Sequence, residues 1–133
     1  MATTTVLDNE FATVWFYEDT KIIHHVIKKW VSGENLRNIL NSGYEVIRDK
    51  KGTKWLSDDR LNNALRLDDA EWARTDWFPR MVTAGWKSWA VVLPEKIIGQ
   101  MNMKAFAEEY KKGGVTANLF SDPAVALKWL EDQ

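Results

Sequence analysis

The side chains best suited to chemistry gather after two β-prone runs of the sequence. The segment SDDR (57–60) follows the first run, and Glu95 follows the second. In α/β proteins ligands bind beyond the carboxyl ends of parallel strands, so these carboxylates, the arginine and the serine hydroxyl would share one edge of the sheet. Asp58, Asp59 and Arg60 are therefore a candidate hydrolytic set, because paired carboxylates perform general acid–base catalysis. The alternative is structural: the aspartates cap the next turn and Arg60 pairs with one of them.

The other reactive groups predict neither a metal site nor a covalent mechanism. His24 and His25 are adjacent, so on a strand they point to opposite faces and do not readily share one metal. We expect one of them to be partly buried and the other exposed. The chain has no cysteine, which excludes disulfides and thiolate chemistry. It also contains no HExxH, GxSxG, GxGxxG or P-loop motif. These observations predict a protein without metal or cofactor, and with no catalytic role.

The densest aromatic segment is EWARTDWFPRMVTAGWKSW (71–89), which holds four of the eight tryptophans. On a helical wheel Trp77 and Met81 lie on one apolar stripe that Phe78 widens, and this stripe predicts a core face. Trp89 opens an almost wholly apolar strand and is also predicted to be core. A second interpretation uses the same side chains, with Trp77, Phe78, Met81 and Trp89 lining an apolar pocket for a small molecule or lipid.

Trp72 and Pro79 do not fit the core stripe, because both fall on the opposite side of the wheel. A proline inside a helix removes one hydrogen bond and clashes with the carbonyl four residues earlier, here that of Thr75. We therefore predict a kink or break near Trp77 and Phe78. If the helix breaks, Trp72 would turn inward and pack against a loop. If it only bends, Trp72 and Pro79 would form an exposed apolar patch for a protein partner or a second copy of the chain.

Length and charge set the broad class. The 133 residues suit one domain, 1–133, and the 18 basic and 19 acidic side chains give a net charge of −1. Such a balance gives no attraction to nucleic acid, and the apolar runs are too short for membrane insertion. MATTTVLDNE at the N-terminus has neither the basic nor the apolar region of a signal peptide. We expect a soluble, cytoplasmic protein.

Hydrophobic periodicity and turn residues predict an α/β fold. A β-hairpin comes first, and strands and helices then alternate, which favours a mostly parallel mixed sheet of about five strands with four helices. Locally, Ser32 and Asp122 are candidate helix N-caps, and Gly43 marks close packing. The predicted strands cover 11–17, 22–30, 53–57, 87–93 and 115–120, and the helices cover 34–49, 69–84, 100–112 and a segment from residue 123.

Three segments, KWLSDDR, DWFPR and DPAVALKWL, carry a family resemblance. Over most of residues 11–132 the chain resembles a set of small, uncharacterised bacterial proteins of the STAS-like group, which has the SpoIIAA-like fold of anti-sigma-factor antagonists. The resemblance implies a hairpin followed by β/α units and a regulatory role in protein–protein interaction. Such antagonists are switched at a serine in Asp-Ser-Ser-Gly, but this chain reads SDDRLNNALRLDDAEW there, so no phosphorylation site is carried over.

Besides the hydrolase that would use Asp58, Asp59 and Arg60, two functional hypotheses follow from the sequence. In the first, the chain is a non-enzymatic STAS-like regulatory module that binds a protein partner or forms a homodimer. In the second, it binds a small apolar ligand in an aromatic-lined pocket. The candidate binding residues for these hypotheses are Asp58, Asp59, Arg60, Trp72, Trp77, Phe78, Pro79 and Glu95.

Overall fold

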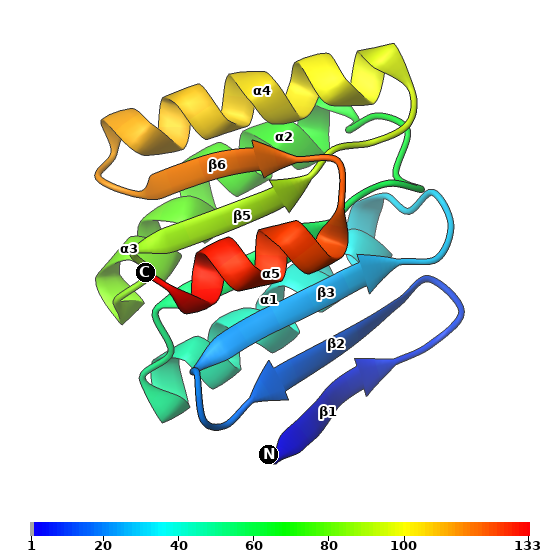
Figure 1. Cartoon of the computed structure of the whole chain (residues 1–133). Helices are drawn as coiled ribbons and strands as arrows, with labels where there is room; N and C mark the ends of the chain where they lie inside the picture. Colours follow the sequence, from blue (N-terminus) through cyan, green and yellow to red (C-terminus); the bar gives the residue numbers. More distant parts are fainter. Residues whose placement is uncertain (1) are drawn as a thin grey trace.

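A six-stranded mixed sheet, whose strands lie in chain order, forms the centre of the molecule (Figure 1). The computed structural model describes residues 2–133. The pairs β1–β2 and β2–β3 are antiparallel, and the three remaining pairs are parallel. The predicted α/β class and N-terminal hairpin are therefore confirmed. The strands are β1 (Thr3–Asp8), β2 (Ala12–Tyr17), β3 (Ile22–Ile27), β4 (Lys54–Asp58), β5 (Ser88–Val92) and β6 (Thr116–Phe120).

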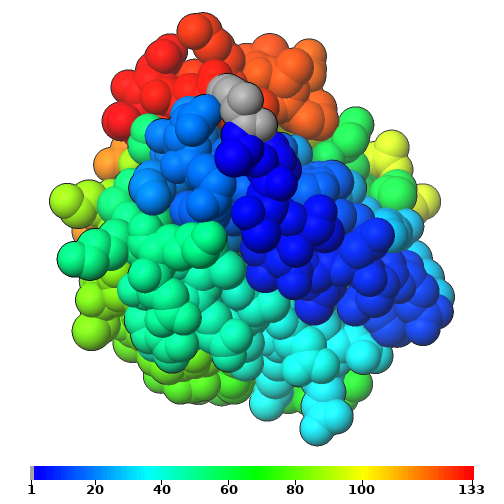
Figure 2. All heavy atoms as spheres, turned by 90° about the horizontal axis from the view of Figure 1, so that it is seen from below, coloured from blue at the N-terminus to red at the C-terminus, as the bar shows by residue number. Residues whose placement is uncertain are grey.

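The predicted number of about five strands omitted β1. This strand pairs with β2 along the edge of the sheet, and its register shifts between Thr5 and Leu7. Figure 2 views this edge, with β1 in dark blue, α5 in red on one side and α1 in cyan to green on the other. Most of β1 is exposed, so it lacks the buried apolar alternation by which a strand is recognised in a sequence.

One layer of helices, formed by α1, α2–α3 and α4, covers one face of the sheet, and α5 covers the other (Figure 1). The segments α2, η1 and α3 follow one another without interruption and form one helix, so the prediction of four helices holds for residues 2–133. We call the side with α1, α2–α3 and α4 the helix-covered face, and the other side the α5 face. The helices are α1 (Gly33–Lys50), α2 (Leu67–Trp72), η1 (Ala73–Trp77), α3 (Phe78–Ala84), α4 (Ile97–Lys112) and α5 (Pro123–Glu131).

Side-chain alternation divides the core into two clusters. On the helix-covered face Trp55 packs with Trp77, Trp86 and Trp89, and all four are buried. The α5 face has a smaller cluster in which strand residues meet Ala126 and Leu130 of α5. Because successive side chains of a strand point to opposite faces, every two-residue motif on β3 or β4 is split between these environments.

The sequence predicts a kink or a break near Trp77 and Phe78. The helix that contains Pro79 does not break, but its regular α-helical hydrogen bonding is interrupted just before the proline. The segment η1 is a π-helical turn, in which the backbone N–H of Phe78 donates to the carbonyl of Ala73 five residues earlier. In a regular α-helix the proline ring would clash with the Thr75 carbonyl. The wider turn takes up this conflict, and the backbone of Trp77 and Phe78 stays right-handed helical.

Local predictions on caps and packing have mixed outcomes. Asp122 caps α5, since its carboxylate accepts a hydrogen bond from the backbone N–H of Ala124 at 2.9 Å. Ser32 does precede α1, but its side chain makes no capping hydrogen bond. Gly43 packs against the ring of Trp55, and a Cβ at this position would overlap the indole.

Candidate functional site

A cavity of about 60 Å³ lies on the helix-covered face, at the carboxyl ends of the parallel strands. The sheet forms its floor, while α1, α2–η1 and α4 form its walls. The cavity is mainly apolar, with a few hydrogen-bonding groups. Apolar and aromatic lining comes from Ile27, Leu36, Ile39, Leu40, Leu65, Ala73, Trp77, Trp89, Met103, Phe106 and Tyr110, and polar lining comes from His25, Ser57, Asp59, Asn62 and Asp69.

His25 is the central polar group of the cavity, and both of its ring nitrogens are engaged. Nε2 lies 2.8 Å from Oδ1 of Asp59, and Nδ1 lies 2.9 Å from Nε1 of Trp55. An indole N–H only donates, so Nδ1 must carry the lone pair and Nε2 must carry the proton. Trp55 therefore fixes His25 as the neutral Nε2–H tautomer, which donates to Asp59.

Ser57 lies beside His25 in the sheet but is not activated by it. The register of β3 and β4 pairs the two residues, and Oγ of Ser57 accepts a hydrogen bond from Nε1 of Trp89 at 2.8 Å. A nucleophilic serine needs an adjacent general base, most often a histidine nitrogen. Here both nitrogens of His25 have other partners, so the three side chains do not form a Ser–His–Asp triad.

The loop after β4 brings Asp59 and Asn62 to the same cavity. The backbone N–H of Asp59 donates to the carbonyl of Val92 at 3.1 Å, and that of Asn62 donates to the Asp59 carbonyl at 3.0 Å. Both side chains are buried, and Oδ1 of Asn62 has no hydrogen-bond partner among residues 2–133. Most buried polar groups are hydrogen-bonded, so this oxygen is an open acceptor at the cavity.

Aromatic side chains make the apolar wall rigid. Nε1 of Trp77 donates to the carbonyl of Leu40 at 3.0 Å, which ties the π turn to α1. The ring of Trp77 meets that of Trp55 edge to face, with the centroids 5.3 Å apart. On α4, Tyr110 stacks on Phe78 at 4.0 Å, and burial raises the pKa of its hydroxyl. Indoles held by both packing and hydrogen bonds keep the cavity open at a defined shape.

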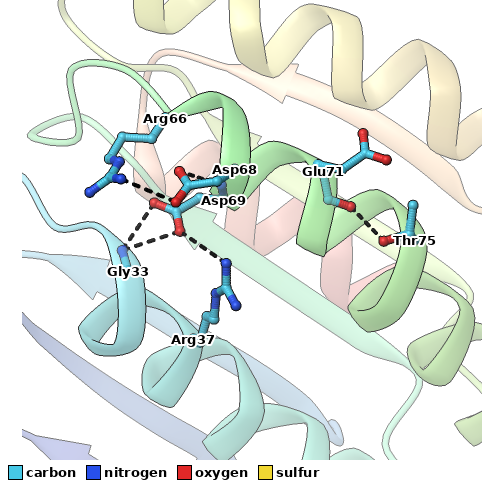
Figure 3. Close-up of polar contacts among 7 residues, drawn as sticks. All are labelled: Gly33, Arg37, Arg66, Asp68, Asp69, Glu71 and Thr75. Atoms are coloured by element: carbon cyan, nitrogen blue, oxygen red, sulfur yellow. Dashed lines mark hydrogen bonds and ion pairs between the residues drawn. The ribbon is translucent and has the colours of Figure 1, made fainter.

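Asp69 connects the cavity wall to the start of α1 (Figure 3). Its two carboxylate oxygens accept from the backbone N–H of Gly33 at 3.0 and 3.2 Å, and Nη2 of Arg37 lies 3.8 Å from Oδ1. The fully buried carboxylate thus supplies the N-terminal cap that Ser32 does not, and it also benefits from the helix dipole. The neighbouring Asp68 instead pairs with Arg66 in an exposed position. Asp69 is therefore a structural group whose charge has partners.

The predicted carboxylate pair is split by the sheet. Asp59 lies on the helix-covered face with His25, whereas Asp58 lies on the α5 face and forms a bidentate pair with Arg60 at 2.9 and 3.0 Å. The loops after β4 and β5 do meet, since the N–H of Glu95 donates to the Arg60 carbonyl at 3.1 Å. The structural interpretation of Arg60 is therefore correct, and the two aspartates do not form a shared hydrolytic site.

His24 lies on the α5 face, opposite the cavity. Nδ1 of its ring lies 2.7 Å from the hydroxyl of Tyr17, while Nε2 is buried without a partner among residues 2–133. Burial lowers the pKa of His24 to about 4, against an opposing effect of Asp58. The prediction of one exposed histidine is wrong, because His25 is buried and His24 is mostly buried.

Trp72 neither turns into a loop nor stands free. The guanidinium of Arg37 lies 5.1 Å from its ring centroid and that of Arg80 lies 6.0 Å away. The ring is half-buried against these cations, which contribute cation–π attraction. Pro79 lies nearby in a shallow surface groove with Arg80. The arginines thus cover part of the Trp72 ring, while Pro79 remains exposed.

The pocket predicted from the aromatic segment exists in part. Trp77 and Trp89 line the cavity, but Phe78 and Met81 pack outside it. Sequence reasoning missed His25, Asn62 and Tyr110 as cavity groups. The alternation of β4 contained a usable signal, because Trp55, Ser57 and Asp59 must share one face.

Comparison of the chain with protein-family models, with curated proteins and with solved structures finds no match in any of the three. Two further features were checked within residues 2–133. No helix there combines the length and apolar character needed to cross a membrane. In the same range, no group of three or more histidine or acidic side chains is placed to hold a metal ion.

Proposed function

We propose that this chain is a small-molecule-binding domain whose site is the cavity on the helix-covered face. One observation carries the proposal: an aromatic-walled cavity at the carboxyl ends of β3, β4 and β5 contains buried polar groups with unused hydrogen-bonding capacity. Apolar walls with a few oriented polar groups are typical of ligand sites. A single water needs ~10–15 Å³, so about 60 Å³ leaves room for a ligand of about four to six non-hydrogen atoms.

The hydrogen-bond geometry favours binding over covalent catalysis at this site. His25 is held between Trp55 and Asp59, so it is oriented but has no free nitrogen for a substrate proton. Ser57 has no base, and Asp58 is on the other face. These contacts position acceptors and exclude water, which are the tasks of a binding site.

A finer fold assignment belongs with this proposal. The N-terminal hairpin, the sequential β/α units and the last helix folded over the opposite face are in keeping with the resemblance to the STAS-like (SpoIIAA-like) group. On this proposal the chain is a cytoplasmic bacterial regulator whose ligand changes its affinity for another protein. The absence of cysteine fits a reducing compartment.

The test is a screen of small fragments against the ¹⁵N-labelled chain by NMR, read at the tryptophan indole N–H signals. A bound fragment should shift the signals of Trp77 and Trp89, which line the cavity, and leave those of Trp15 and Trp129 in place. Ala73→Leu fills the cavity and should abolish these shifts. Ala84→Leu, which projects into an open surface groove, is the matched control and should retain them. Binding that survives Ala73→Leu would contradict the proposal.

A second candidate function, contact with another protein chain, rests on exposed apolar side chains at the start of α4. Ile97 and Ile98 begin α4 and are 73% and 65% exposed, and together with Asn63 and Ala64 they border a shallow groove. Exposed apolar groups in one place are typical of a contact with a protein partner or a second copy. Light scattering with Ile98→Lys tests this role. A wild-type dimer that the substitution dissociates supports it, whereas a wild-type monomer that recovers no partner in a pull-down counts against it.

A further inference from the structure

The buried carboxylate of Asp59 has no balancing positive charge. Asp59 is 5% exposed, and its one hydrogen-bonded side-chain partner among residues 2–133 is His25. A protonated His25 would neutralise it, but protonation would place an N–H on Nδ1, facing the indole N–H of Trp55 at 2.9 Å. Trp55 thereby keeps His25 neutral, and the pair retains the negative charge of Asp59.

The other charges around the cavity do not offset it. Asp69 also lines the cavity, but its charge is met by Arg37 and by the N-terminus of α1. Arg60 is committed to Asp58 on the opposite face. Among the lining residues in the described part of the chain there are two carboxylates and neither lysine nor arginine. A buried charge without a partner costs several kcal/mol, so a cation entering the cavity would remove a penalty that the protein now carries.

The uncharged surroundings also suit a cation. Oδ1 of Asn62, 92% of whose surface is buried, is an acceptor without a partner among residues 2–133, and hydrogen bonding within the loop holds its residue next to Asp59. The indoles of Trp77 and Trp89 line the cavity and supply apolar contact for a short hydrocarbon body. An alkylammonium group has three donors and no acceptor, so it can donate both to the Asp59 carboxylate and to the unpartnered Oδ1 of Asn62.

We propose that the cavity binds a small organic cation, namely a primary alkylammonium with a short apolar body, whose charged nitrogen donates to Asp59 and Asn62. This inference rests on the proposed binding function and specifies the class of its ligand. It also assigns Asp59 a role as the group that selects for positive charge. Neither the fold nor the fixing of the His25 tautomer by Trp55 requires this role.

Three probes of equal size test the inference: n-butylammonium, 1-butanol and propionate, each with five non-hydrogen atoms. Each is titrated at constant ionic strength into the ¹⁵N-labelled full chain, and the indole signals of Trp77 and Trp89 are followed. We expect n-butylammonium to bind at least tenfold more tightly than 1-butanol, and propionate to bind most weakly. Asp59→Asn should reduce the preference for n-butylammonium to within about twofold, whereas Asp58→Asn, on the opposite face, should leave it unchanged.

The outcomes separate this inference from the proposed function. If none of the probes shifts the two indole signals, the binding function itself is overturned. If 1-butanol or propionate binds as tightly as n-butylammonium, the site binds ligands but its selectivity for cations is overturned. The same shifts produced by potassium chloride would overturn the requirement for an organic body. Should Asp59→Asn not fold, as judged by circular dichroism, the order of the three probes on the wild-type chain still decides.

Discussion

The two faces of the sheet receive the same pairs of residues and use them differently. His24 and Asp58 point to the α5 face, while His25 and Asp59, one residue later in each strand, point to the helix-covered face. On the α5 face the carboxylate is paired with Arg60. On the helix-covered face the carboxylate has only a neutral imidazole, and a cavity adjoins it. A single step along a strand thus separates a satisfied ion pair from a group that still has binding capacity.

The faces also differ in how they are filled. The helix-covered face packs four buried indoles, each of which donates a hydrogen bond to a named acceptor. The smaller core of the α5 face is mostly aliphatic, with Trp129 and Phe120 at its margin. Rigid aromatic packing supports a cavity that aliphatic side chains would collapse into, which explains why the candidate site lies on the helix-covered face.

Removing an indole from each face should give the largest difference between them. Trp55→Ala deletes a fully buried ring and the hydrogen bond that fixes His25, and we expect it to lower the free energy of unfolding by about 3–5 kcal/mol. Trp129→Ala, at the margin of the other core, should cost only about 1 kcal/mol. Urea denaturation measures both. Equal costs would contradict the difference in packing.

On the α5 face, the mostly buried His24 should make the free energy of unfolding depend on pH in the acid range. Its pKa is about 4 when folded and 6.5 when unfolded, so between these values the unfolded chain binds more protons. The contribution of a neutral His24 is complete above pH 6.5 and is lost as pH falls toward 4, by about 3 kcal/mol in total. His24→Gln should flatten this part of the profile of unfolding free energy against pH. A variant with the wild-type slope would show that His24 is not the titrating group.

Gly43→Ala probes how tightly the indoles are packed. Alanine would gain about 1 kcal/mol in helix propensity, but its Cβ overlaps the ring of Trp55. We expect a net loss of about 1–3 kcal/mol in the free energy of unfolding. In the background of Trp55→Phe the same change should cost less, because the smaller ring leaves room. A stabilising Gly43→Ala in the wild-type chain would refute the tight contact.

The smallest expected effect is the difference in stability loss between substitutions of two adjacent aspartates, Asp68 and Asp69, on the helix-covered side. Asp69→Asn weakens the cap of α1 and should cost about 1–2 kcal/mol. Asp68→Asn removes an exposed ion pair with Arg66, while the amide oxygen can still accept from the backbone N–H of Asp69, so it should cost less than about 0.5 kcal/mol. Thermal unfolding with both variants measures the difference. If the two substitutions cost the same, the buried cap is not a stabilising feature.

Much of this architecture can be predicted from local patterns, but the site depends on contacts between distant residues. Periodicity located β2 to β6, and Gly43 indicated close packing, which in the structure is against the indole of Trp55. The π turn before Pro79 could not be predicted, because a break and a wider turn relieve the same clash and only packing of Trp77 against Leu40 distinguishes them. The edge strand β1 was missed because it is largely exposed.

In the candidate site, too, some features follow from local sequence patterns and others depend on contacts between distant residues. Alternation on β4 already places Ser57 and Asp59 together and Asp58 apart, so the shared hydrolytic pair could have been rejected from the sequence. The role of Trp55 in fixing the tautomer of His25 joins two strands that lie 30 positions apart in the chain, and the cap from Asp69 to Gly33 spans 36 positions. Such pairings follow from the fold and have no local signature.

The most direct test of the account is a crystal structure of the chain soaked with n-butylammonium. The account predicts electron density for the ligand between Trp77 and Trp89, with its nitrogen within hydrogen-bonding distance of the Asp59 carboxylate, and no such density in crystals of Ala73→Leu. A cavity that contains only ordered water at saturating n-butylammonium would contradict the central claim.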